Sequence, residues 1–107
     1  MKILSELQKK GILISEKDIL LLVEKYNIKE LSIFGSSLRN DFNNKSDIDF
    51  LIEFNDSKNI SLFDLVDIQE YLEAITKRSV DLVEPDSLKN PYRRAAILAN
   101  KEIIYAS

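Results

Sequence analysis

Three aspartates and a Gly-Ser pair are the residues of this chain whose types and spacing could do chemistry. Asp47 and Asp49 are two residues apart in an apolar run, Asp81 lies inside a later apolar run, and Gly35 and Ser36 end an earlier one. Because side chains alternate along a strand, Asp47 and Asp49 would project from one face, about 6.5 Å apart. Asp81 could join them from a neighbouring strand. The spacing therefore predicts a site at which the three carboxylates meet.

Such a cluster would favour a divalent cation. Two carboxylates about 4 Å apart repel by roughly 1 to 4 kcal/mol at effective dielectric constants of about 80 to 20, and a cation turns that repulsion into binding. The chain has no histidine and no cysteine. Oxygen atoms would then hold the metal, which favours Mg²⁺ or Mn²⁺ over Zn²⁺. The same absences exclude a histidine base, a cysteine nucleophile and disulfide bonds.

The Gly35-Ser36 pair is suited to a phosphate group. Glycine lets the backbone approach a phosphate closely, and the N–H groups of a following helical turn, with the Ser36 hydroxyl, could bind its oxygens. Taken alone, a Gly-Ser pair is most often only a turn, and an Asp-x-Asp is most often a solvated strand entrance. The order favours chemistry: the turn closes one strand, the Asp pair opens the next, and Asp81 lies within a third.

The elements that must position these residues alternate along the chain as one compact α/β unit. Strands are predicted at about Leu31 to Phe34, Asp47 to Phe54 and Ser79 to Glu84, and the run Ile103-Ile104-Tyr105 is either an edge strand or a packed tail. Helices are predicted after three capping signals, which are Ser15 with Asp18, Ser61 with Asp64, and Asn90 before Pro91. Helical spacing predicts two buried stripes: Ile19, Leu20, Val23 and Leu22 in one helix, and Leu65, Ile68, Leu72 and Ile75 in the other. Phe34, Phe50, Phe54 and Tyr71 are interpreted as core residues, not as a base-stacking set.

Length and charge narrow the class of protein. A chain of 107 residues is expected to form a single domain, residues 1–107. Its net charge of −3 argues against direct binding of nucleic acid through the phosphate backbone, and the short basic pairs Lys9-Lys10 and Arg93-Arg94 are interpreted as solvated helix positions. The sequence has no signal-peptide pattern and no apolar stretch of membrane-spanning length, so we expect a cytoplasmic protein.

These motifs resemble the minimal nucleotidyltransferases of the DNA polymerase β-like superfamily, and specifically the MNT antitoxins that are paired with HEPN-domain toxins. The resemblance runs from Leu31 to Tyr105. It is carried by the segments Gly35-Ser36-Ser37-Leu38-Arg39-Asn40, Ser46-Asp47-Ile48-Asp49-Phe50, Val80-Asp81-Leu82-Val83 and Arg93-Arg94-Ala95-Ala96-Ile97-Leu98. It implies an α/β (α+β) nucleotidyltransferase fold, with a small mixed sheet flanked by helices.

The resemblance also implies a reaction, in which an acceptor oxygen attacks the α-phosphorus of ATP and pyrophosphate leaves. Asp47 and Asp49 would hold two Mg²⁺ ions, and Asp81 would complete the shell of the second ion and accept the acceptor's proton. Gly35 and Ser36 would seat the phosphates. Arg39 would neutralise charge near the pyrophosphate, although an ion pair with a nearby acid is an equal alternative. Leu38 and Asn40 depart from the family's usual alanine and glycine, but neither change removes a metal ligand.

The implied acceptor is a tyrosine of a HEPN ribonuclease toxin, which the transfer of AMP silences. The chain would then act in a hetero-oligomer with that toxin. Two alternatives remain open from the sequence. The chain could be an antitoxin that blocks its partner sterically, or it could modify a small molecule such as an aminoglycoside.

Overall fold

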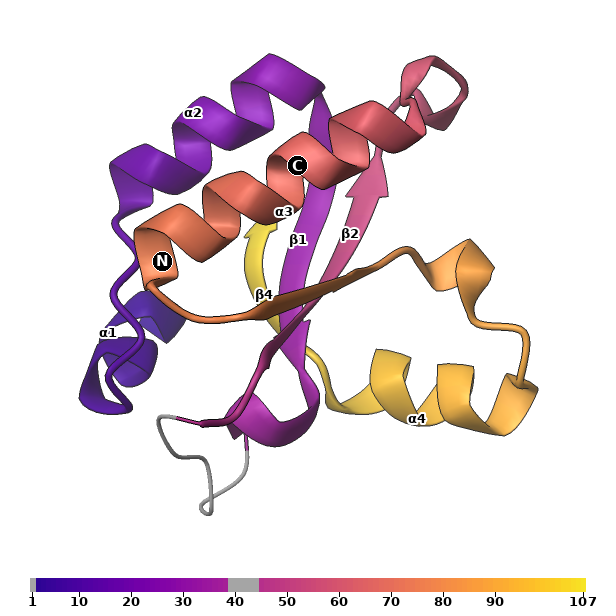
Figure 1. Ribbon diagram of the computed structural model, residues 1–107. Helices are drawn as coiled ribbons and strands as arrows, with labels where there is room; N and C mark the ends of the chain where they lie inside the picture. Colours follow the sequence, from indigo (N-terminus) through magenta and orange to yellow (C-terminus); the bar gives the residue numbers. More distant parts are fainter. Residues whose placement is uncertain (1, 39–44) are drawn as a thin grey trace.

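The computed structural model describes residues 2–38 and 45–107 (Figure 1). The helices in these residues are α1 (Lys2–Lys9), α2 (Glu16–Tyr26), α3 (Leu62–Thr76) and α4 (Pro91–Asn100). The strands are β1 (Ile28–Phe34), β2 (Ile48–Phe54), β3 (Val80–Val83) and β4 (Glu102–Ala106). Three short 3₁₀ turns join them: η1 (Gly35–Leu38), η2 (Ser57–Asn59) and η3 (Pro85–Ser87).

The strands form one mixed sheet in the order β3-β2-β1-β4. β1 runs antiparallel to both β2 and β4, whereas β2 and β3 are parallel. The connection from β2 to β3 passes through α3, as a parallel pair requires a crossover. The expected α+β fold with a small mixed sheet flanked by helices is confirmed.

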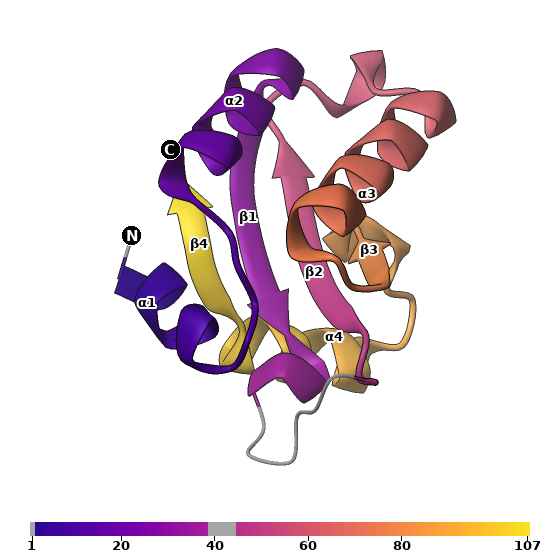
Figure 2. The ribbon, with the colours of Figure 1, turned by 60° about the vertical axis from the view of Figure 1, so that its left-hand side comes forward.

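The two faces of the sheet are covered unequally. Three helices lie together on one face (Figures 1 and 2). There α1 contacts β4, α2 contacts β1 and α3 contacts β3. The large core lies beneath them and includes Phe50, Ile52 and Leu72. On the opposite face α4 covers a small cluster of Phe34, Leu51 and Leu88 through its Ile97 and Leu98. Among the described residues, no other helix lies on this second, more open face (Figure 2).

The predicted helix starts are confirmed by their caps. The Ser15 side chain accepts a hydrogen bond from Asp18 N, and Ser61 and Asp64 form a reciprocal capping box. Asn90 caps α4 by accepting hydrogen bonds from two backbone N–H groups, with Pro91 in the first turn. A side-chain cap of this kind contributes about 1 kcal/mol to helix stability.

Several predicted boundaries need correction. β1 begins at Ile28, not Leu31, because a register irregularity between Ile28 and Glu30 hides the strand's alternation in the sequence. β2 begins at Ile48 and not at Asp47, and β3 spans Val80–Val83 instead of residues 79–84, since end residues pair poorly. Leu20 is 44% exposed, so the buried stripe of α2 consists of Ile19, Leu22 and Val23.

The C-terminal run is an edge strand, which decides an alternative that the sequence left open. β4 pairs with β1, and Ile104 enters the main core. Phe34, Phe50 and Phe54 are buried, as expected of core residues, and Tyr71 packs against the core. Among the described residues, no helix has the length and apolar character needed to cross a bilayer.

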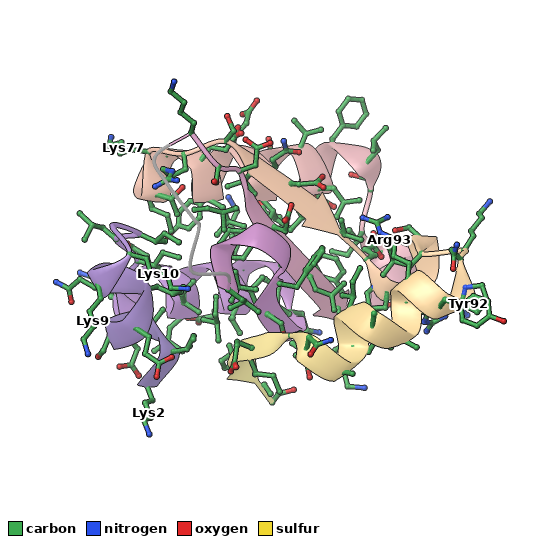
Figure 3. All side chains as sticks on the ribbon, turned by 90° about the horizontal axis from the view of Figure 1, so that it is seen from below. Lys2, Lys9, Lys10, Lys77, Tyr92 and Arg93 are labelled. Carbon is green, nitrogen blue, oxygen red and sulfur yellow. The ribbon has the colours of Figure 1, made fainter. Side chains whose placement is uncertain are left out.

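The basic pairs are exposed, as expected. Figure 3 shows Lys9 and Lys10 around α1 and Arg93 at the far end of α4, on opposite sides of the view. Tyr92 points outward from the end of α4. The labelled cations are therefore dispersed and do not form one stripe.

Candidate active site

The register of β2 and β3 brings two of the predicted aspartates together. Asp49 and Asp81 are Cα partners in the parallel pair, so their side chains leave the sheet side by side. They share a face with Leu51 and Val83, which pack in the small cluster beside α4. The two carboxylates therefore stand on the open face, and the large core lies on the other side of the sheet.

Asp47 lies just before β2, where it is exposed, and Asp49 is half-buried. The structure thus places all three aspartates near the start of the parallel pair. Within residues 2–38 and 45–107, however, no three acidic side chains gather closely enough to form a metal-binding group. Of the three predicted aspartates, the structure therefore pairs Asp49 with Asp81, and Asp47 lies two residues before Asp49. Their oxygen donors are of the kind that Mg²⁺ prefers, and in this respect the site fits a divalent cation.

Gly35 is fixed in identity by its contact with Asp49. Phe34 pairs with Asp49 across β1 and β2, and Gly35 follows it with φ +71°. A Cβ at Gly35 would lie 3.3 Å from Cγ of Asp49 and closer still to its Oδ2. Only glycine combines this backbone conformation with such an approach. The turn expected to bind phosphate is therefore packed directly against a carboxylate expected to bind metal.

The remaining predicted site residues are only partly described. Ser36 belongs to η1, and only its backbone is among what the structure describes. Arg39 and Asn40 lie outside the described residues. The roles assigned to Ser36 and Arg39 stay predictions.

Side chains from α3 hold β3 in the register that the site needs. Val80 donates its N–H to Oε2 of Glu73 at 3.0 Å, and its carbonyl accepts from Nε2 of Gln69 at 3.0 Å. Val80 is the Cα partner of Ile48, and the next pair along the two strands is Asp81 with Asp49. The bonds from α3 therefore hold Val80 in the register that places Asp81 beside Asp49. The sequence reasoning missed Gln69 and Glu73. The spacing of these two polar residues at i and i+4, on one face of α3, was the available signal.

Arg78 ties the Asp47 segment to the α3–β3 connection. Its Nη2 donates to the Ser46 carbonyl at 3.1 Å, and Ile48 N donates to the Ser79 carbonyl at 3.0 Å. These two bonds bring the residues before β2 to the residues before β3. Arg78 also went unrecognised in the sequence, because no local pattern links an arginine to a carbonyl 32 residues away.

A model of a known protein family matches most of this chain. A model described as "Nucleotidyltransferase domain" matches residues 17–104, which include the Gly-Ser turn and all three aspartates. The chain belongs to the nucleotidyltransferase domain family. The predicted resemblance is confirmed, and the α+β arrangement is that family's fold.

Nucleotidyltransferase-domain relatives of similar length are known in archaea. Two Methanocaldococcus jannaschii proteins, each provisionally named protein adenylyltransferase, are 38% and 40% identical over 105 residues, covering 98% of this chain and 99% of theirs. The protein adenylyltransferase MntA of Thermococcus cleftensis is 33% identical over 84 residues, covering 78% of this chain and 80% of its own.

Solved structures share the fold. A structure provisionally described as a minimal nucleotidyltransferase superposes with a TM-score of 0.67 at 26% identity, over 80% of this chain and 85% of that one. A toxin-antitoxin crystal structure with AMP-PNP gives a TM-score of 0.68 at 18% identity, over 88% and 75% of the two chains.

Proposed function

We propose that this nucleotidyltransferase domain is a protein adenylyltransferase that acts as an antitoxin. It would transfer AMP from ATP to a tyrosine of a HEPN-domain ribonuclease toxin. One observation carries the proposal: Asp49 and Asp81 stand in register beside Gly35 in a chain of this family. Two relatives matched over 99% of their length are provisionally named protein adenylyltransferase, and a third matched over 80% of its length carries that name outright. A structural neighbour is a toxin-antitoxin crystal structure with AMP-PNP. These findings support the proposal.

The residues have distinct roles in this proposal. Asp47 and Asp49 would hold two Mg²⁺ ions, with Asp81 completing the shell of the second. Bound there, the ions would supply charge stabilisation for the attacking and leaving oxygens. The backbone at Gly35 and Ser36 would seat the phosphates, and Arg39 would offset charge near the leaving pyrophosphate.

The protein's own contribution to the reaction is orientation and proton transfer. The tyrosine oxygen forms a bond to the α-phosphorus of ATP, and the bond from that phosphorus to pyrophosphate breaks. The tyrosine proton passes to a carboxylate oxygen of Asp81. Because β2 and β3 fix Asp49 and Asp81 before substrate arrives, little reorganisation is needed at the moment of reaction.

The decisive experiment follows the label of α-³²P-ATP, with Mg²⁺, onto a co-expressed HEPN-domain toxin. The wild type should label the toxin, whereas the Asp47→Ala, Asp49→Ala double variant should not. Glu53→Ala is the matched control, because Glu53 lies on the same strand and face as Asp49 without belonging to the site.

Two outcomes would overturn the proposal. If neither form labels the toxin but both neutralise it, the chain is a steric antitoxin. If an aminoglycoside is labelled in the absence of any protein partner, the chain is a small-molecule nucleotidyltransferase. Label on the toxin that depends on the aspartates supports the proposal.

A further inference from the structure

The first turns of α3 expose large apolar side chains that the proposed reaction does not use. Leu62 is 75% exposed, Phe63 is 81% exposed and Val66 is 45% exposed. All three lie within five residues of one helix. Single exposed apolar residues are ordinary on protein surfaces, but a group of this size marks an interaction site.

A groove between α2 and α3 lies next to the helix face that carries Phe63, whereas Leu62 and Val66 point about 180° and about 140° away from Tyr71, which lines the groove. It has a volume of about 530 Å³, and its apolar lining comes from Leu21, Leu22, Tyr26 and Tyr71. Phe63, Asp67 and Tyr71 follow one another at intervals of four residues, so they share a face of α3. Asp67 and Tyr71 line the groove. Phe63 therefore stands at the end of the groove's own helix face.

The charge around this groove is predominantly negative. Glu24 and Asp67 line it together with Lys25, and α3 carries no lysine or arginine from Leu62 to Thr76. A second hollow of about 430 Å³ shares Lys25 and Tyr26 with the groove and is also lined by Asp56 and Asp64. Lys25, the basic residue of both linings, lies over the Tyr26 ring at 5.3 Å. A complementary partner would be apolar and basic.

We propose that this surface docks the toxin through an amphipathic helix whose apolar side chains are flanked by lysine or arginine. The "α3 surface" denotes Phe63 with the groove between α2 and α3. Helices commonly bind by placing an apolar stripe in such a groove. A second copy of this chain is a poorer occupant, because it would bring two acidic helices together. The inference rests on the proposed function for the identity of the partner.

Docking here would leave the candidate active site uncovered. α2 and α3 lie on one face of the sheet (Figure 2). Asp49 and Asp81 share the other face with Leu51 and Val83. The toxin's acceptor segment would reach them past the edge strand β3. Variants of the α3 surface therefore change binding without touching the carboxylates, so docking and chemistry can be measured apart.

The test is isothermal titration of a purified HEPN-domain toxin into the full chain. Phe63→Ser and, separately, Leu21→Ser, at a half-exposed residue that lines the groove, should each raise Kd at least tenfold, and Asp67→Asn with Glu70→Gln should reduce the salt dependence of Kd. Tyr92→Ser is the matched control, since Tyr92 is an 86% exposed aromatic at the start of α4, and its Kd should stay within twofold. Circular dichroism verifies that each variant is folded, which the exposure of these side chains favours.

The outcomes separate this inference from the proposed function. If Kd is unchanged in Phe63→Ser and Leu21→Ser while the wild type still labels the toxin, the docking inference is wrong and the function stands. If Kd rises in these variants but no form of the chain transfers label, docking stands and the function is wrong. Absence of binding by the wild type overturns docking. Self-association of the chain that Phe63→Ser abolishes also overturns it, because the surface would then join two copies.

Discussion

Asp49 of β2 and Asp81 of β3 are register partners, so two carboxylates 32 residues apart in sequence emerge side by side from one face of the sheet. Asp81 is exposed and Asp49 is half-buried. Like charges at neighbouring positions of paired strands repel each other. The proposed transfer reaction would use both carboxylates.

Replacing either carboxylate should greatly reduce transfer. We expect Asp49→Asn and Asp81→Asn each to lower AMP transfer at least a hundredfold, equivalent to about 2.7 kcal/mol of transition-state stabilisation. In Asp81→Asn the free energy of unfolding, measured in urea, should stay equal or rise slightly because repulsion between the two side chains is relieved. Glu53→Gln makes the same charge change on the same face of β2 and should retain transfer. Full activity in Asp49→Asn would contradict the assignment.

Gly35→Ala should cost more stability than an alanine at the chain's other glycine. Both Gly35 and Gly11 have positive φ, +71° and +83°, but a Cβ at Gly11 meets nothing within 4 Å. The positive φ costs alanine about 1 to 2 kcal/mol at either position. The contact with Asp49 adds about 1 to 3 kcal/mol at Gly35 alone.

The measurement is the difference in unfolding free energy between the two glycine variants. Transfer of AMP should fall in Gly35→Ala and stay unchanged in Gly11→Ala. Equal destabilisation of the two variants would show that Asp49 moves aside without cost.

Glu73→Ala should loosen the register of β3. The variant leaves the Val80 N–H without its acceptor, which we expect to cost about 1 to 2 kcal/mol. Glu73→Gln keeps a side-chain carbonyl and should restore most of the loss. Glu70→Ala, on the exposed side of the same helix, should change the unfolding free energy by less than about 0.5 kcal/mol. Hydrogen exchange at the Val80 amide reports the positioning directly, and unchanged protection there in Glu73→Ala would refute it.

Tyr71 should make stability fall at alkaline pH. Burial and the nearby Asp18 carboxylate raise the pKa of Tyr71 above its usual value near 10, and its hydroxyl donates to the Asp18 carbonyl at 2.9 Å. The folded state therefore favours the neutral phenol. This contribution is complete below the unfolded pKa, near 10, and is lost as the pH rises through the higher folded pKa.

Tyr71→Phe should remove that component of the pH dependence and cost about 0.5 to 1.5 kcal/mol at neutral pH through the lost hydrogen bond. Urea unfolding as a function of pH, with phenolate absorbance as the titration signal, measures both effects. An identical alkaline decline in the variant and the wild type would assign the decline to other groups.

The sequence by itself determined the local features of this protein. Ser61 and Asp64 predicted a helix start because a capping box involves only residues three apart. Apolar residues at every second position, Ile48, Phe50 and Ile52, predicted β2, because a strand buries alternate side chains. The sequence likewise predicted the motif residues and the family that they indicate, since a turn glycine and an Asp-x-Asp are local patterns.

Tertiary structure decided which residues meet. Three contacts join segments that are far apart in the sequence. Asp49 pairs with Asp81, Gly35 packs against Asp49, and Glu73 accepts a hydrogen bond from Val80 N. The edge position of β4 and the register irregularity in β1 also depend on pairing between strands. Local propensity does not encode such contacts, because register is set by how whole elements pack and a shift of one residue would turn every side chain to the opposite face.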